Sequence, residues 1–321
     1  MADDARDMLV LFTHLPKAGG SSLGAMLGAD ARSPGEACHL RWNGLDREHS
    51  CGSLRSWLRG KNGWSARHAG GLPHGPGATM ANASLDADTP FPRCKTLWAQ
   101  HVDFSIVELA RLHHPKLRIQ PVMLMRHPVD LFFSEFLYKR HCLWRQQGRN
   151  GPDAASAISL SQHIARLRAQ PERRTLLTRF LAGASWCSCA TDWATRRALP
   201  ERELRSRALA NAATYAVLGN LARAAPSLDR IERLLGSNRS GTVTSARGAR
   251  RGAGGAGKVN ALAQCVDEAA LPATDRPTDA QRAEVAALLA TDVALYEELD
   301  RRFASPRAGA RERLKGSSYA F

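Results

Sequence analysis

Two segments of the chain combine residue types that bind phosphate groups. The first follows the apolar run 8–12 and consists of Lys17, Ala18, Gly19, Gly20, Ser21 and Ser22. Glycine lets the backbone approach an anion closely, and successive N–H groups at a helix start point toward it. The sequence therefore predicts a phosphate-binding turn, although an ordinary strand–helix turn with an exposed lysine is an alternative. It is not a Walker A loop, because that motif has Lys at the end of the turn and Lys17 opens this one.

The second segment places a cation at the end of another expected strand. The apolar run 119–125 ends at Arg126, and Pro128 suits the first turn of a helix over 129–140. Ser134 lies one to two turns into that helix. Ligands of an open parallel sheet bind off the carboxyl ends of its strands, so Arg126 and Ser134 are candidates for a second phosphate site. The alternative is an arginine in a salt bridge and a serine on the helix surface.

Apolar runs and amphipathic segments alternate along the chain, which indicates the fold class. Strands are expected at 8–12, 96–99, 119–125 and 215–218, and helices at 106–113, 129–140, 158–183, 194–210, 228–235 and 278–303. This alternation predicts an α/β fold with a mainly parallel central sheet flanked by helices. We expect one domain over 9–303, after an extension at 1–8 and before a disordered tail at 304–321. Within the domain, 28–93 is expected to be an irregular insertion and 240–257 a flexible loop.

Charge and composition limit the partners of the protein. The 321 residues include 45 Lys and Arg against 30 Asp and Glu, a net charge of +15, which predicts an anionic partner. A composition with 44% hydrophobic residues is that of a globular protein. The sequence contains no uninterrupted apolar run of about 18 residues, so no transmembrane helix is expected. The acidic, polar start of the chain does not fit a signal peptide.

The seven cysteines do not have the spacing of a zinc site. They are expected to be buried thiols or to form one to three disulfides. Asn82 and Asn238 stand in glycosylation sequons, which are compatible with the lumen of the secretory pathway.

Several segments together resemble one enzyme family. Residues 12–23 (FTHLPKAGGSSL) resemble the 5′-phosphosulfate loop of Golgi carbohydrate sulfotransferases, in particular the heparan sulfate 2-O- and 6-O-sulfotransferase group. Residues 124–135 (LMRHPVDLFFSE) are similar to the 3′-phosphate motif of that group. Further similar segments follow in the same order, at 100–104, 175–183, 216–221, 227–236 and 292–303. The resemblance covers residues 9–303.

The resemblance implies a P-loop-like three-layer fold and transfer of a sulfuryl group from 3′-phosphoadenosine 5′-phosphosulfate (PAPS) to a carbohydrate hydroxyl. Lys17 would stabilise the leaving group, and the turn 17–22 would bind the 5′ end of the donor. Arg126 and Ser134 would hold the 3′-phosphate. His101 stands where the family has its general base, and Lys258 lies in a segment similar to a loop that closes over the nucleotide. No metal is needed.

This sequence also departs from the family pattern. Ala18 replaces a usual Thr, His127 a usual Asp and Gln100 a frequent Gly. Four further histidines compete with His101 for the role of base and are interpreted as structural: His14, His113, His114 and His127. Asp103 and Glu135 either orient the base, contact substrate or are solvated carboxylates.

Two other function classes remain as alternatives. A P-loop phosphotransferase is disfavoured, because neither GK[ST] nor a recognisable magnesium-binding Asp is present. A non-catalytic polyanion-binding protein would use exposed arginines such as Arg207, Arg239, Arg247, Arg250 and Arg251. No nucleic-acid motif is present, so no nucleic-acid partner is expected.

For the sulfotransferase, the acceptor is expected to be an anionic polysaccharide or another glycan, such as a glycosaminoglycan, an N-glycan or a glycolipid. The resemblance implies a place in the Golgi lumen or membrane. Members of that family are usually anchored in the membrane there, and we expect no such anchor within this sequence.

Overall fold

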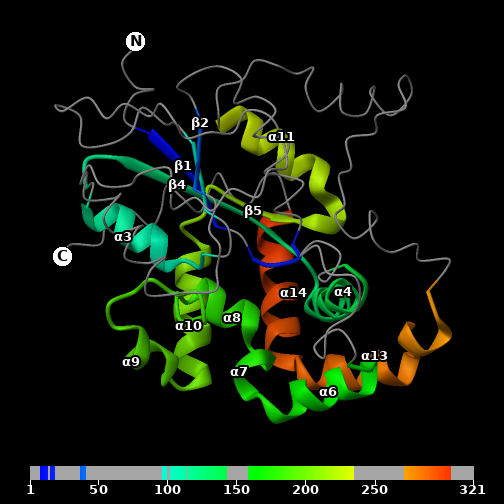
Figure 1. Ribbon diagram of the computed structural model, residues 1–321. Coiled ribbons are helices and arrows are strands. Elements are labelled where there is room, and N and C mark those ends of the chain that lie inside the picture. The colour runs from blue at the N-terminus through cyan, green and yellow to red at the C-terminus, as the bar shows by residue number, and fades with distance from the viewer. Residues whose placement is uncertain are drawn as a thin grey trace, which may run out of the picture.

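The computed structural model describes residues 8–13, 15–18, 37–40, 96–99, 102–113, 115–142, 158–234 and 271–304. Their centre is a parallel sheet with the strand order β2-β3-β1-β4-β5 (Figure 1). The strands are β1 (Met8–Thr13), β2 (Ala37–Leu40), β3 (Thr96–Ala99), β4 (Arg118–Met125) and β5 (Val217–Asn220). The expected α/β fold with a parallel sheet is therefore confirmed. The domain limits remain a prediction, since 1–7, 240–257, 305–321 and most of 28–93 lie outside the described residues.

Strand β1 lies in the middle of the sheet and pairs with β3 on one side and β4 on the other. Leu11 is in register with Leu97 of β3 and with Pro121 of β4. The chain adds β2 and β3 to one side of β1, and β4 and β5 to the other. The strand order therefore reverses at β1 and β4, which is the position where open parallel sheets form a ligand-binding crevice.

Helices cover both faces of the sheet because apolar side chains of the central strands alternate between them. Leu9 and Leu11 join the larger core cluster, whereas Val10 and Phe12 join a second cluster that includes Ile231. Ile231 belongs to α11 (Ala224–Leu234), which packs against β4 and β5. On the opposite face lie α3 (Ser105–His113), α8 (Leu176–Leu181), α10 (Glu201–Ala212) and α14 (Ala290–Ala304) (Figure 1).

Helix α4 (Pro128–His141) begins directly after β4, as the proline predicts. Its apolar side chains form a third cluster with α6 (Leu160–Ala169) and α13 (Asp279–Leu288). Phe132 and Phe136 of α4 are buried there beside Ile164 and Val285. This packing fixes α4 on one side, while its N-terminus stays at the carboxyl end of the sheet.

Three expected helices are shorter than the sequence indicated. Residues 158–183 form α6, α7 (Pro171–Arg174) and α8 rather than one helix. Pro171 separates α6 from α7, because it removes a backbone donor and disfavours helical geometry at Gln170, and α7 and α8 separate at Thr175. Pro200 likewise divides 194–210 into α9 (Trp193–Arg197) and α10. Residues 278–303 form α13 and α14, which separate at Leu289 without a proline.

Smaller elements complete the described chain. Strand β2 lies within 28–93, where no strand was expected. Two short 3-10 helices, η2 (Leu221–Arg223) and η4 (Ala273–Asp275), precede α11 and α13. None of the described helices has both the length and the apolar character needed to cross a bilayer.

Candidate functional site

The first predicted phosphate-binding segment leaves the sheet at the end of β1. Leu15 and Ala18 are buried, and the Ala18 N–H donates to the Leu15 carbonyl at 3.2 Å, which closes a tight turn. Lys17 in that turn has a φ of 64°, the left-handed conformation that non-glycine residues rarely adopt. The turn thus holds Lys17 in a defined, strained conformation at the carboxyl edge of the sheet.

Arg126 follows β4, the strand beside β1, and reaches across to the Lys17 turn. Its Nη1 donates to the carbonyl oxygen of Lys17 at 3.4 Å. The two residues are 109 positions apart in the sequence. The structure therefore brings together the two strand ends that the sequence singled out as phosphate-binding.

Helix α4 contributes a third wall through Tyr138 and Ser134. The Nζ atom of Lys17 lies 3.4 Å from the centre of the Tyr138 ring, a close cation–π contact. Ser134 is only 4% exposed and is four residues before Tyr138, so the two side chains share one face of α4. Contacts thus join Lys17 to Arg126 and to Tyr138, and Ser134 lies one helical turn before Tyr138; we call these four residues the strand-end site. Tyr138 was not predicted, although its spacing from Ser134 is the available signal.

The start of α4 has no side-chain cap. The N-cap residue His127 makes no side-chain hydrogen bond to the first turn. Its ring instead packs edge-on against Tyr296 of α14, with the ring centres 5.1 Å apart. His127 thus has a packing role, in line with its interpretation as a structural histidine. Its side chain does not cap the first-turn N–H groups of α4. Such N–H groups attract anions.

Asp103, two residues after the candidate base His101, is a buried structural carboxylate. Its Oδ1 accepts hydrogen bonds from the Ser105 N–H at 3.0 Å and the Ser105 hydroxyl at 2.5 Å. Its Oδ2 accepts from the Ser185 N–H at 3.0 Å and the Ser185 hydroxyl at 2.8 Å. Burial raises the pKa of Asp103 to about 6, although these hydrogen bonds oppose the rise. Asp103 is therefore neither solvated nor available as a substrate contact.

A glycine allows the chain to reach Asp103 after α8. Gly183 has a φ of 66°, and a Cβ at this position would lie 3.2 Å from the Ser105 N atom. The turn that it makes carries Ser185 to Asp103 and leaves Trp186 half exposed. Nearby, Cys187 is a buried thiol and Cys189 is disulfide-bonded, so both of the alternatives that the sequence left open occur.

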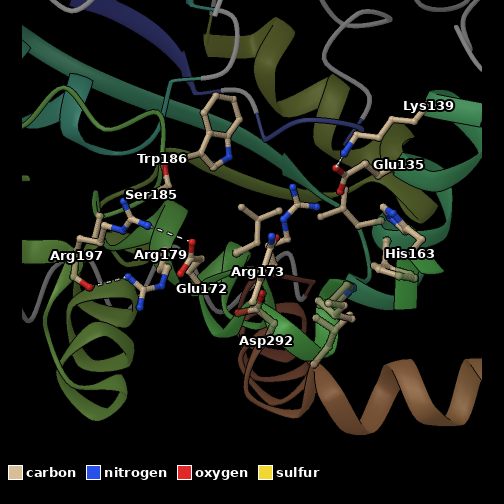
Figure 2. A pocket seen from close by; sticks show the side chains of 18 residues that line it. Glu135, Lys139, His163, Glu172, Arg173, Arg179, Ser185, Trp186, Arg197 and Asp292 are labelled. Atoms are coloured by element: carbon tan, nitrogen blue, oxygen red, sulfur yellow. Dashed lines mark hydrogen bonds and ion pairs between the residues drawn. The ribbon is translucent and has the colours of Figure 1, made fainter. Parts of the chain in front are cut away.

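A pocket of about 570 Å³ adjoins this turn. It lies between α4, α6, α7, α8 and the residues Ala184–Trp186 (Figure 2). Glu135 belongs to its wall, is partly exposed and forms an ion pair with Lys139. Burial alone would raise the pKa of Glu135, but the adjacent Lys139 charge outweighs it and holds this pKa below the ordinary value. Sequence reasoning missed this pocket.

Several predicted site residues lie outside the described part of the chain. These are His101, Gly19, Gly20, Ser21, Ser22 and Lys258, together with the rival histidines His14 and His114. Of the remaining rivals, His113 ends α3 and is partly exposed. Within the described residues, no group of three or more His, Cys, Asp or Glu side chains is arranged to hold a metal ion.

Comparisons with known proteins do not place the chain in a family. No model of a known protein family matches it, and no curated protein matches it significantly.

Proposed function

We propose that this protein is a sulfotransferase that moves a sulfuryl group from PAPS to a hydroxyl of a carbohydrate. The observation that carries the proposal is the contact of Arg126 with the Lys17 turn at 3.4 Å. It joins Arg126 to the turn that carries Lys17, so two cationic residues stand at the ends of adjacent parallel strands. A donor with phosphate groups at both its 5′ and 3′ positions needs two such anion sites.

The topology supports this assignment of the strand-end site. Residues Lys17 and Arg126 follow β1 and β4, the strands at which the sheet order reverses. Phosphate-bearing ligands of open α/β sheets bind in this crevice. We therefore propose a P-loop-like fold in which the turn 17–22 surrounds the 5′ end of the donor, and Arg126 and Ser134 hold the 3′-phosphate. Lys258 would close over the nucleotide from a segment outside the described residues.

The chemistry follows from charge and position. The acceptor oxygen forms a bond to sulfur while the bond from sulfur to the 5′-phosphate oxygen breaks, so negative charge grows on that oxygen. Lys17 stabilises this charge, as preorganised cations do in phosphoryl transfer. The Tyr138 ring beneath its Nζ restricts the ammonium to one side of the turn. His101 takes the proton of the acceptor hydroxyl, because imidazole titrates near neutral pH.

The proposed setting is the lumen of the Golgi. The disulfide at Cys189 supports an oxidising compartment, since disulfides persist mainly in secretory and extracellular proteins. The net charge of +15 is favourable for an anionic glycan acceptor.

Ligand-induced thermal stabilisation tests the proposal and separates it from its alternatives. We expect 3′-phosphoadenosine 5′-phosphate (PAP) to raise the melting temperature, because a ligand that binds only the folded state stabilises it. Stabilisation by ATP with Mg²⁺ but not by PAP would favour a phosphotransferase, and stabilisation by RNA alone a polyanion-binding protein. Incubation with radiolabelled PAPS and a panel of glycans then identifies the acceptor. The absence of both PAP binding and label transfer would refute the sulfotransferase.

A further inference from the structure

The pocket beside α4 has the size and construction of a second ligand site. Its volume of about 570 Å³ falls within the range usual for small-molecule pockets. It is lined by Glu135 and Lys139 of α4, next to the face that carries Ser134 and Tyr138, so it adjoins the strand-end site across one helix. Nothing in the proposed sulfuryl transfer uses its lining residues. The inference drawn from it therefore does not rest on that function.

The floor of the pocket is apolar. It is formed by Leu131 and Phe132 of α4, Leu167 of α6, Leu176 of α8, and Leu289. Except for Leu176, these side chains are at most 7% exposed. A ligand rich in hydroxyl groups would lose hydrogen bonds to water against this floor without replacing them. The floor therefore favours a ligand with an apolar body.

Most charges on the pocket wall neutralise one another. Lys139 pairs with Glu135, and Arg197 donates to Glu172 at 3.1 Å. Arg179 donates to the Thr175 hydroxyl and to the main-chain carbonyl of Arg197, both at 3.0 Å. Figure 2 shows the contacts of Glu135 with Lys139 at one end of the pocket and those of Arg197 at the other.

Asp292 is the remaining carboxylate on the wall and is satisfied internally. It accepts hydrogen bonds from the Leu177 N–H at 2.7 Å and from the Thr178 N–H and hydroxyl at 2.9 and 2.6 Å. With four cationic side chains against three carboxylates, the pocket lining carries one net positive charge. A ligand with a single negative charge neutralises it.

Arg173 is the cation that can receive this ligand charge. It is exposed on α7, and its N–H donates to the Gln170 carbonyl at 3.0 Å. Its guanidinium makes no hydrogen bond or ion pair with any described residue, although its charge helps to lower the pKa of Glu135. It lies in the middle of the pocket, between the two paired ends (Figure 2). A guanidinium in this position offers the forked donor geometry that matches a carboxylate.

His163 supplies an unsatisfied polar atom in the same wall. Its side chain is 5% exposed, and the ring packs between Phe132 and Phe136 with centre distances of 4.7 and 5.6 Å. Its Nε2 atom has no hydrogen-bond partner among the described residues. Burial lowers the pKa of His163 to about 4, although Glu135 opposes this, so the ring is neutral at pH 7. A buried polar atom without a partner favours a ligand group that bonds to it.

Trp186 completes the pocket at its mouth. Among the described residues, it is one of two large hydrophobic side chains that are exposed, at 50%. An indole at a pocket mouth offers a flat face on which a ring can stack.

We propose that this pocket binds a ring-bearing organic monoanion, with its carboxylate on Arg173, a hydroxyl on His163 Nε2, and its ring between Trp186 and the apolar floor. The ligand class is thus a hydroxylated aromatic carboxylate.

Isothermal titration calorimetry with three probes tests this assignment. We expect 6-hydroxy-2-naphthoate to bind the full chain, and 2-naphthol, which lacks the carboxylate, to bind about tenfold more weakly or worse. Glucuronate carries the charge without the apolar body, so we expect no measurable binding. No binding of the naphthoate, or equal binding of glucuronate, would overturn the proposal.

A pair of arginine variants assigns the binding to the pocket. Arg173→Gln should weaken naphthoate binding about tenfold, because it removes one charge-assisted contact. Arg202→Gln, at an exposed position of α10 away from the pocket, is the matched control and should change affinity by less than about twofold. Circular dichroism checks that both variants are folded. Equal affinities of the two variants would place the binding elsewhere and refute the site.

Discussion

Arg126 donates a hydrogen bond to the main-chain carbonyl oxygen of Lys17, at 3.4 Å, across 109 positions of sequence. The bond goes to the backbone of the turn, so it ties the end of β4 to the turn that follows β1. Two cations held at neighbouring strand ends repel each other, and a bound dianion removes that repulsion. This arrangement leads to testable expectations for each residue of the strand-end site.

Replacement of Arg126 should weaken donor binding specifically. Arg126→Ala removes the proposed 3′-phosphate contact, and we expect the affinity for PAP to fall about tenfold to a hundredfold. Arg118→Ala is the matched control, because Arg118 is exposed at the opposite end of the same strand. Isothermal titration calorimetry measures both. A PAP affinity that is unaltered in Arg126→Ala would remove this residue from the donor site.

Because Lys17 has a left-handed backbone conformation, two substitutions can separate its effect on stability from its effect on catalysis. Lys17→Ala and Lys17→Gly both remove the ammonium, so both should abolish sulfuryl transfer. Glycine tolerates a φ of 64° without a steric penalty, and alanine does not. We expect Lys17→Gly to be the more stable of the two by about 1 kcal/mol, measured by urea unfolding. Transfer that persists in either variant would contradict the role of Lys17.

The contact between Lys17 and Tyr138 predicts that Tyr138→Phe and Tyr138→Leu differ in turnover. Tyr138→Phe keeps a ring beneath the ammonium and should retain most of the turnover. Tyr138→Leu removes the cation–π contact, which is worth about 0.5 to 2 kcal/mol, so turnover should fall about twofold to thirtyfold. Steady-state assays with labelled PAPS distinguish the two. Equal turnover in both variants would show that the ring does not position Lys17.

The elements that the sequence predicted are those with strong local signals. Strands β1 and β4 are apolar runs buried on both faces, and the helix after β4 begins at a proline. Since both strands are parallel and adjacent, their carboxyl ends bring the Lys17 turn and Arg126 together, whereas the sequence predicted only two separate strand-end sites. The φ of Lys17 and its contact with Tyr138 depend on how α4 packs, which no local pattern encodes.

The pocket was beyond sequence reasoning for a different reason. Its two unsatisfied groups, His163 and Arg173, belong to helices that the sequence analysis merged into one. The break at Pro171 turns the chain, so residues ten positions apart come to line the same space. Strand β2 was missed because four residues within a long aperiodic segment carry too little pattern.

Replacement of the candidate base His101 should affect transfer rather than donor binding, whereas replacement of Arg126 should weaken donor binding. His101→Ala should abolish transfer while PAP affinity changes little, because a general base acts on the acceptor and not on the donor. His113→Ala, at the partly exposed end of α3, is the control and should keep normal turnover. Unchanged turnover in His101→Ala would refute its role as base.

Asp103 predicts a pH dependence of stability whose sign can be measured. Burial raises its pKa from 3.8 to about 6 in the folded state, so the folded protein binds the proton more tightly than the unfolded chain. Asp103 therefore contributes stability at low pH that is lost as the pH rises through this range, by about 3 kcal/mol in total.

Asp103→Asn isolates this contribution because it removes the titration. It also replaces the oxygen that accepts the two Ser185 hydrogen bonds with an NH2 group, which cannot accept them. The variant should therefore be less stable than the natural chain by about 2 to 4 kcal/mol at pH 4. This gap should narrow as the pH rises from about 4 to 7, as measured by urea unfolding at each pH. Asp279→Asn, at the exposed start of α13, serves as control and should show no such change. A gap that widens with rising pH would mean that the four hydrogen bonds outweigh burial and hold the pKa of Asp103 down.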